Sequence, residues 1–265
     1  MSKIAKLAFP APPPHRPYWH VDAKWVCGLL FALGLGLTLN LIMAWRLTAP
    51  EVAVPVATEV VASLFSPDGL DETASINELR QQAAAQPGEI VQVPVGSQSV
   101  TLTKQELATL SPREIRLKIF RQVVEPFYNL GVDGVAAQAG TPDEQAKFKQ
   151  QAGLLGLLNR QTHDRIWTLV LWTGGVSLVF LIGLVGFSWH WGRLASPGVV
   201  ILLTALPGAL FAVALTTVGG GAAHVSQDLM RQVVGMLVLP YAVAAGAGLL
   251  LLLVAGVGRL AVRLR

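Results

Sequence analysis

The sequence has few cysteines and few charged residues, and both shortages restrict the chemistry of the chain. Its one cysteine is Cys27, so an internal disulfide, a paired-cysteine metal site and a nucleophilic thiol outside the surroundings of Cys27 are excluded. Charged residues make up 14% of the chain, against about 25% in typical globular proteins. With a mean hydropathy of +0.53, this composition is typical of a polytopic membrane protein that carries one modest soluble domain.

Motifs for catalysis and for cofactor binding are also missing. The sequence contains no GxSxG, HExxH, P-loop or paired-cysteine pattern, and no GxGxxG between a strand and a helix. We therefore expect no catalytic residues, no cofactor and no enzymatic activity in this chain. The net charge of +4 comes mostly from the flanks of the predicted spans, and the sequence contains no basic patch with interleaved aromatic residues. This pattern favours contact with anionic headgroups of a lipid bilayer and argues against nucleic acid as a partner.

What the sequence does contain is four long uncharged runs, each close to the roughly 20 residues that cross a bilayer as a helix. They predict an α-helical polytopic membrane protein with four transmembrane helices, one N-terminal and three C-terminal. A small, mostly helical α+β domain is expected between the first and second. The predicted order is a Pro-rich tail at 1–24, a span at 25–45, the domain at 46–165, spans at 166–187, 198–218 and 233–257, and a basic tail at 258–265.

The distribution of basic residues predicts the orientation of these spans. One side would hold eight basic residues and the single acid Asp22, whereas the short loop on the other side holds Asp228 and Arg231. The eight are Lys3, Lys6, Arg16, Lys24, Arg193, Arg259, Arg263 and Arg265. By the positive-inside rule, both termini are cytoplasmic, the membrane is the cell inner or plasma membrane, and the region 46–165 is exported. The first span exceeds the apolar core of a cleaved signal peptide, so we expect a retained signal anchor.

Within the region 46–165, local signals predict several short elements. Two prolines near its start favour an irregular or broken helical segment at 46–66. A helix is expected at 71–86 and a small hairpin from 89–94 and 97–102. Start signals at Thr103 with Glu106, Ser111 with Glu114, and Thr141 with Glu144 open three further helices. The last of these is expected to run into the second span as a stalk or to lie on the outer leaflet.

Three residues are candidates for contact with a partner or ligand. Arg116 falls on the apolar side of the helix that begins at Pro112, where it would either reach an outside partner or anion, or pair with a carboxylate of the domain. His163 and His224 both flank spans on the domain side. They are either ordinary interfacial histidines or part of a metal, haem or pH-sensitive site. Because converging ligands of fixed spacing are missing, we predict no metal ligand among them.

These features favour a non-enzymatic integral membrane subunit of a larger membrane complex, whose exported domain recognises a partner or ligand. The uncharged spans and the small-residue stripe at Gly28, Ala32 and Gly36 are suited to packing, within the chain or against other membrane protein subunits. The order of one span, an exported domain and three spans is similar to the layout of MacB and FtsX type proteins. That similarity implies the alternative of a permease or transmission subunit that works with a separate cytoplasmic ATPase. A histidine-based membrane redox or metal protein is the third alternative.

Overall fold

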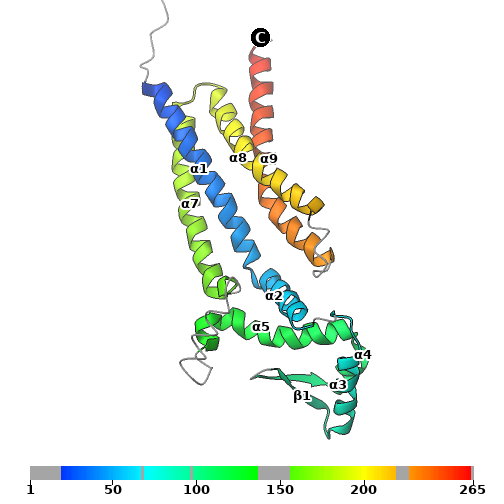
Figure 1. Ribbon diagram of the computed structural model, residues 1–265. Helices are drawn as coiled ribbons and strands as arrows, with labels where there is room; N and C mark the ends of the chain where they lie inside the picture. Colours follow the sequence, from blue (N-terminus) through cyan, green and yellow to red (C-terminus); the bar gives the residue numbers. More distant parts are fainter. Residues whose placement is uncertain (1–18, 67–68, 96–97, 137–155, 219–226, 264–265) are drawn as a thin grey trace, which may run out of the picture.

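The chain forms four long helices and a small domain that lies across one end of them (Figure 1). This computed structural model describes residues 19–66, 69–95, 98–136, 156–218 and 227–263. The elements are α1 (Trp19–Leu47), α2 (Pro50–Leu64), α3 (Ala74–Ala85), β1 (Ile90–Val95), β2 (Gln98–Thr103), α4 (Lys104–Thr109), α5 (Pro112–Ala136), α7 (Arg160–Phe187), α8 (Gly192–Val218) and α9 (Gln227–Arg263).

Four of these helices, α1, α7, α8 and α9, are long and apolar enough to cross a membrane, as the sequence predicted. Each begins or ends beyond the uncharged run that identified it. The residues 19–24, expected as part of a tail, form the first turns of α1, and the basic segment after 257 continues α9 to Arg263. The turn expected at 188–197 is confined to its first four residues, because α8 begins at Gly192. The remainder of the predicted Pro-rich tail, residues 1–18, lies outside the described residues.

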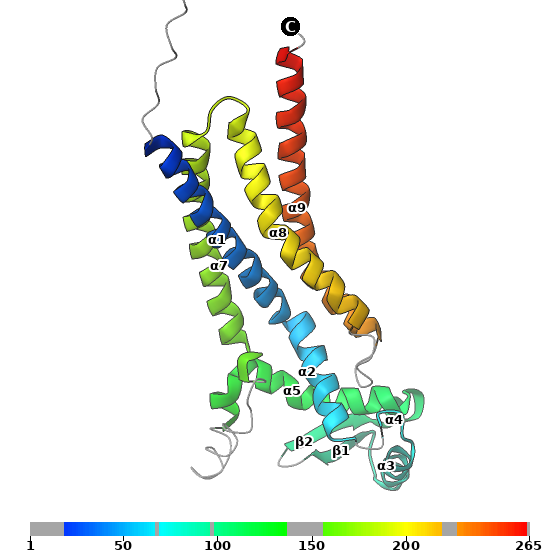
Figure 2. The ribbon, with the colours of Figure 1, turned by 45° about the horizontal axis from the view of Figure 1, so that its top comes forward.

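The four helices associate as two antiparallel pairs, α1 with α7 and α8 with α9 (Figures 1 and 2). A glycine lies at each interface. A Cβ on Gly34 of α1 would lie 2.5 Å from Oγ of Ser177 in α7, and a Cβ on Gly248 of α9 would lie 2.9 Å from the carbonyl oxygen of Gly198 in α8. Small residues let the helix backbones approach this closely. The hairpin expected from the second and third spans is present in sequence order, but its two helices pack mainly against other partners.

Tyr241 of α9 connects the two pairs. Its ring lies over Gly208 of α8, where a Cβ would be 2.1 Å from the ring, and its hydroxyl donates a hydrogen bond to Oδ1 of Asn40 in α1 at 3.0 Å. Leu39 and Ala205 are buried beside it. Asn40 thus makes an interhelical hydrogen bond, and a polar contact inside the apolar bundle fixes which faces of the three helices meet.

The domain between α1 and α7 has its own core, built from the hairpin and three helices. β1 and β2 are antiparallel, with Val91 opposite Leu102 and Val93 opposite Val100. Val91, Val100, Leu102 and Ile115 of α5 are almost completely buried. The predicted hairpin is confirmed, and so is the helix predicted at 71–86, which is α3. The Thr103–Glu106 capping box is complete.

Glu114 and Lys118 lie one turn apart on α5, a spacing that favours an ion pair between them. The Lys118 ammonium group nevertheless contacts Glu106 of α4. Glu114 instead accepts hydrogen bonds from the amide and hydroxyl of Ser111 at 2.8 and 2.7 Å, which completes the second start signal. Pro126 and Gly131 were the residues predicted to end this helix. The helix passes through Pro126 and is interrupted at Gly131, whose φ of 71° favours glycine, before it resumes to Ala136. The third start signal, at Thr141, lies outside the described residues.

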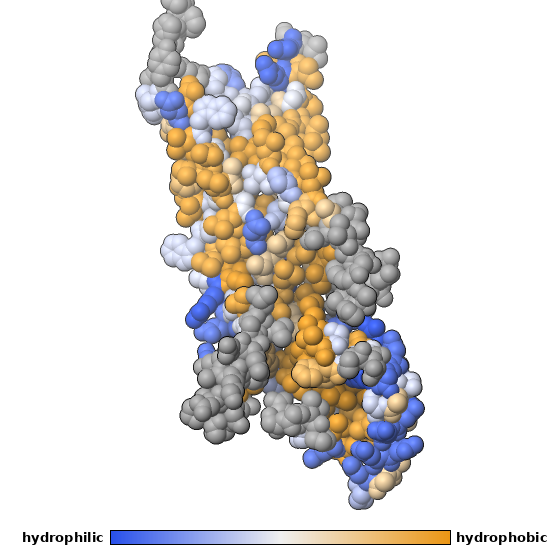
Figure 3. All heavy atoms as spheres, in the orientation of Figure 1, coloured by the Kyte–Doolittle hydropathy of each residue, from blue (hydrophilic) through white to orange (hydrophobic). Residues whose placement is uncertain are grey.

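The surface of the molecule divides in the same way as the fold. Figure 3 shows apolar side chains over the four long helices and polar side chains gathered at the far end of the domain and at the opposite ends of the helices. This distribution is that of helices that face lipid.

Candidate functional site

The junction between the domain and the long helices is a break in an otherwise continuous helical path. α1 ends at Leu47 and α2 begins at Pro50, with Ala49 in an extended conformation at φ −63° and ψ 140°. A residue before proline is driven out of the helical region by the proline ring. The segment 46–66 is thus the broken helical segment that its prolines predicted, and the break leaves helix-end carbonyl groups that need donors.

Tyr128 of α5 supplies one of those donors. Its buried hydroxyl donates a hydrogen bond to the carbonyl oxygen of Thr48 at 2.8 Å. Burial raises the pKa of the Tyr128 hydroxyl, so the group remains protonated and able to donate. Around it, Val54 and Ala57 of α2 pack against Tyr128 and Val124 of α5. α5 is therefore attached directly to the end of the first span.

His163 attaches the second span to the same point. Its Nδ1 lies 3.1 Å from the carbonyl oxygen of Trp45 and 3.2 Å from Oγ1 of Thr48. Because a carbonyl only accepts, this geometry assigns the proton to Nδ1. The imidazole stacks on the Trp45 ring with 5.2 Å between the ring centroids, and the centroids of the Trp45 and Trp167 rings are 4.8 Å apart. His163 thus ties the start of α7 to the end of α1.

His224, the other candidate histidine, lies outside the described residues. Across the residues that are described, no group of three or more histidine, cysteine, aspartate or glutamate side chains is arranged to hold a metal ion.

Arg116 is engaged inside the domain. Its side chain is 7% exposed, and its guanidinium group donates to the carbonyl oxygen of Gly69, to the carboxylate of Glu72 and to Oγ of Ser75. A hydrogen bond from Ser75 lowers the pKa of Glu72, and Arg116 lowers it further. The pairing with a domain carboxylate is therefore present, and it holds the segment before α3 on α5. Contact of Arg116 with an outside partner stays a prediction.

An apolar surface that the sequence did not predict lies where α2 ends beside α5, and it is formed by Leu64, Phe65 and Phe120. We call it the Phe65 surface. Leu64 and Phe65 are 70% and 73% exposed, and the Phe65 ring stacks on Phe120 of α5 at 5.9 Å with an interplanar angle of 21°. Its signal in the sequence was two large apolar residues at the end of a helix, directly before Ser66 and Pro67.

Comparison of the chain with models of protein families, with curated proteins and with solved structures finds no match in any of the three. The function is therefore argued from the geometry alone.

Proposed function

We propose that this chain is a non-enzymatic integral membrane subunit of a larger membrane complex, and that its domain binds another subunit through the Phe65 surface. The exposure of Phe65 and Leu64 is the observation that carries this proposal. The domain has a complete core without them, because Val91, Leu102 and Ile115 are buried by other side chains. Adjacent large apolar side chains that the core does not use are typical of a protein contact surface.

We infer that the domain is exported and that both termini are cytoplasmic, in the cell inner or plasma membrane. In support, Arg193, Arg259 and Arg263 lie at the helix ends remote from the domain (Figure 1). Basic residues also flank the domain, at Arg46 and Arg160. These two residues carry little weight in assigning the orientation, because the positive-inside rule applies to loops of up to about 60 residues and the domain is longer.

The orientation is tested with single cysteines. In a Cys27→Ser background, Glu78→Cys on the exposed side of α3 and Arg263→Cys at the end of α9 are each labelled in intact cells with a membrane-impermeant maleimide. The proposal predicts labelling at position 78 in intact cells, and at position 263 only after permeabilisation. The reverse pattern would show the opposite orientation.

The partner contact is tested by affinity purification from native membranes in mild detergent, followed by mass spectrometry. We expect the native chain to retain other membrane subunits at stoichiometric level. Phe65→Asp should weaken the contact about 30-fold and lower their recovery accordingly, because loss of a central aromatic contact costs about 2 kcal/mol or more. Ile90→Asp is the matched control, since Ile90 is also exposed but lies on the hairpin. Recovery of the native chain alone, or equal losses in both variants, would contradict the proposal.

The junction favours a second candidate, a transmission subunit for a separate cytoplasmic ATPase. Tyr128 and His163 meet at the Thr48 end of α1, so a displacement of the domain acts on α1 and α7 together. On this proposal a cytoplasmic ATPase binds at the segment 188–197 and copurifies with the chain. Failure of any ATPase to associate would count against it.

A further inference from the structure

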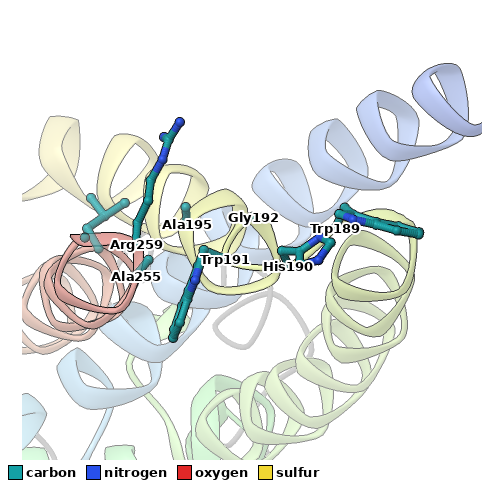
Figure 4. A pocket seen from close by; sticks show the side chains of 9 residues that line it. Trp189, His190, Trp191, Gly192, Ala195, Ala255 and Arg259 are labelled. Carbon is teal, nitrogen blue, oxygen red and sulfur yellow. The ribbon is translucent and has the colours of Figure 1, made fainter. Parts of the chain in front are cut away.

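A cavity of about 450 Å³ lies at the helix ends remote from the domain. It is open to the outside and is lined by the turn between α7 and α8 and by the last turns of α9 (Figure 4). Trp189, His190 and Trp191 contribute from the turn, Leu252 and Ala255 form an apolar wall, and Arg259 lies at the end of that wall. In Figure 4 the Arg259 side chain, from α9, and the Trp191 side chain, from the turn, extend in opposite directions.

The sequence shapes this cavity through the turn. Ser188 is buried and its Oγ donates to the carbonyl oxygen of Leu184 at 2.7 Å, which holds the end of α7. His190 has a φ of 45°, a left-handed conformation that reverses the chain within a few residues. The Trp191 ring then lies against Gly258 of α9, where a Cβ would be 2.1 Å away. The turn and α9 are thus in direct contact, and the cavity is bounded by packed side chains.

The charge of the cavity is positive. Among the described residues that line it, Arg259 is the one that carries a charge, and none is a carboxylate. Among the ion pairs of the described residues, none involves Arg259. The cavity lies at the ends of three candidate spans and is bordered by two tryptophans, and interfacial tryptophans lie at the depth of the lipid headgroups.

We propose that this cavity binds one anionic phospholipid, and we call it the Arg259 pocket. The Arg259 guanidinium pairs with the headgroup phosphate. The glycerol and the first carbons of an acyl chain lie on Leu252 and Ala255. An anionic lipid fits because basic pockets between membrane helices are suited to its headgroup, and a guanidinium binds phosphate with charge-assisted hydrogen bonds. This site is independent of the Phe65 surface and of any partner subunit.

The test is native mass spectrometry of the full chain in detergent, titrated with dioleoylphosphatidylglycerol or with dioleoylphosphatidylcholine. The two lipids share their acyl chains and differ in headgroup charge. We expect one phosphatidylglycerol molecule to bind about tenfold more tightly than phosphatidylcholine. Both headgroups carry the phosphate, but the choline ammonium of phosphatidylcholine cancels its charge and is repelled by the Arg259 guanidinium, and tenfold corresponds to about 1.4 kcal/mol. Equal affinities would overturn the proposal.

Variants locate the lipid. Arg259→Gln removes the charge from the Arg259 pocket and should abolish the preference for phosphatidylglycerol, whereas Arg259→Lys should keep part of it, because a lysine retains the charge without the planar fork. Arg263→Gln is the matched control, because it removes the same charge from the same helix end outside the pocket lining. Equal losses in the 259 and 263 glutamine variants would show attraction by net charge alone and would refute the site.

Inorganic phosphate is titrated as a separate arm, and binding as tight as that of the lipid would refute a lipid as the occupant. Arg259 is exposed, so its variants should fold, which thermal melting confirms.

Discussion

Replacing Tyr128 with phenylalanine tests whether the junction holds the domain on the spans. The change removes one hydroxyl group, whose hydrogen bond to the Thr48 carbonyl oxygen is 2.8 Å long. In an uninterrupted helix the amide of Val52 would donate to that oxygen. Here the amide of Val52 donates to the carbonyl oxygen of Ala49 at 2.9 Å. Tyr128 therefore replaces a backbone donor that the helix break has removed.

The cost of the substitution follows from the burial of this contact. An unsatisfied buried acceptor costs about 1–3 kcal/mol. That cost corresponds to an increase of about 5- to 150-fold in the equilibrium for local opening of the junction. The phenylalanine ring keeps the packing with Val54 and Ala57, so the cost should come from the hydrogen bond and not from a cavity.

Hydrogen–deuterium exchange in detergent measures this opening. The amides of Val52 and Ala53, which donate to the Ala49 carbonyl oxygen, should exchange faster in Tyr128→Phe by the factor given above, while the hairpin amides should not change. Tyr241→Phe is the control, because it removes a tyrosine hydroxyl bonded to Asn40 inside the bundle. Unchanged exchange in Tyr128→Phe, or the same acceleration in both variants, would refute the role of Tyr128.

Three further predictions concern the bundle and the domain. Gly34→Val should lower the melting temperature in detergent by several degrees, because its side chain meets Ser177, whereas Gly175→Val meets open space and should not. Thr103→Ala should cost about 1 kcal/mol of stability, seen as faster exchange at the Glu106 amide that Thr103 caps. The pKa of Glu106 is lowered, and the main cause is the hydrogen bond that its carboxylate accepts from the Lys118 ammonium group. A lowered carboxyl pKa stabilises the fold above the ordinary value of 4.5, so the melting temperature should fall as the pH decreases below that value. Glu106→Gln should reduce this pH-dependent decrease in melting temperature. A decrease of the same size in that variant would show that Glu106 is not its source.

The features that the sequence predicted correctly are those set by neighbouring residues. An uncharged run of about 20 residues has few stable states except a membrane helix or a buried one, so α1, α7, α8 and α9 were recognised without knowledge of their contacts. The capping box at Thr103 and the start of α5 at Pro112 depend on residues three or fewer positions apart. The helical wheel likewise placed Arg116 on the buried side of α5, although it did not identify Glu72 as its partner.

The features that the sequence did not predict depend on contacts between distant segments. Small residues occur in α1 and in α9, and their spacing does not show that Gly34 meets Ser177 or that Gly248 meets Gly198. The roles of Tyr128 and His163 were missed for a similar reason, because the broken helix they complete is far from both in sequence. The Phe65 surface was missed because Phe120 belongs to the apolar side of an amphipathic helix, where burial in the core was the expected outcome.

The connections between these parts show how a force on the domain would be distributed. Tyr128 bonds the domain to the end of α1, and His163 bonds α7 to the same end. The helices α1 and α7 pack together along their length (Figure 2). The α8–α9 pair meets α1 around Tyr241, whose hydroxyl bonds to Asn40. A load on the Phe65 surface therefore reaches the α1–α7 pair first and the α8–α9 pair through the Tyr241 contact. The Arg259 pocket lies where α9 meets the turn from α7 to α8, so a bound lipid would stabilise the contact between the two pairs at the end remote from the domain.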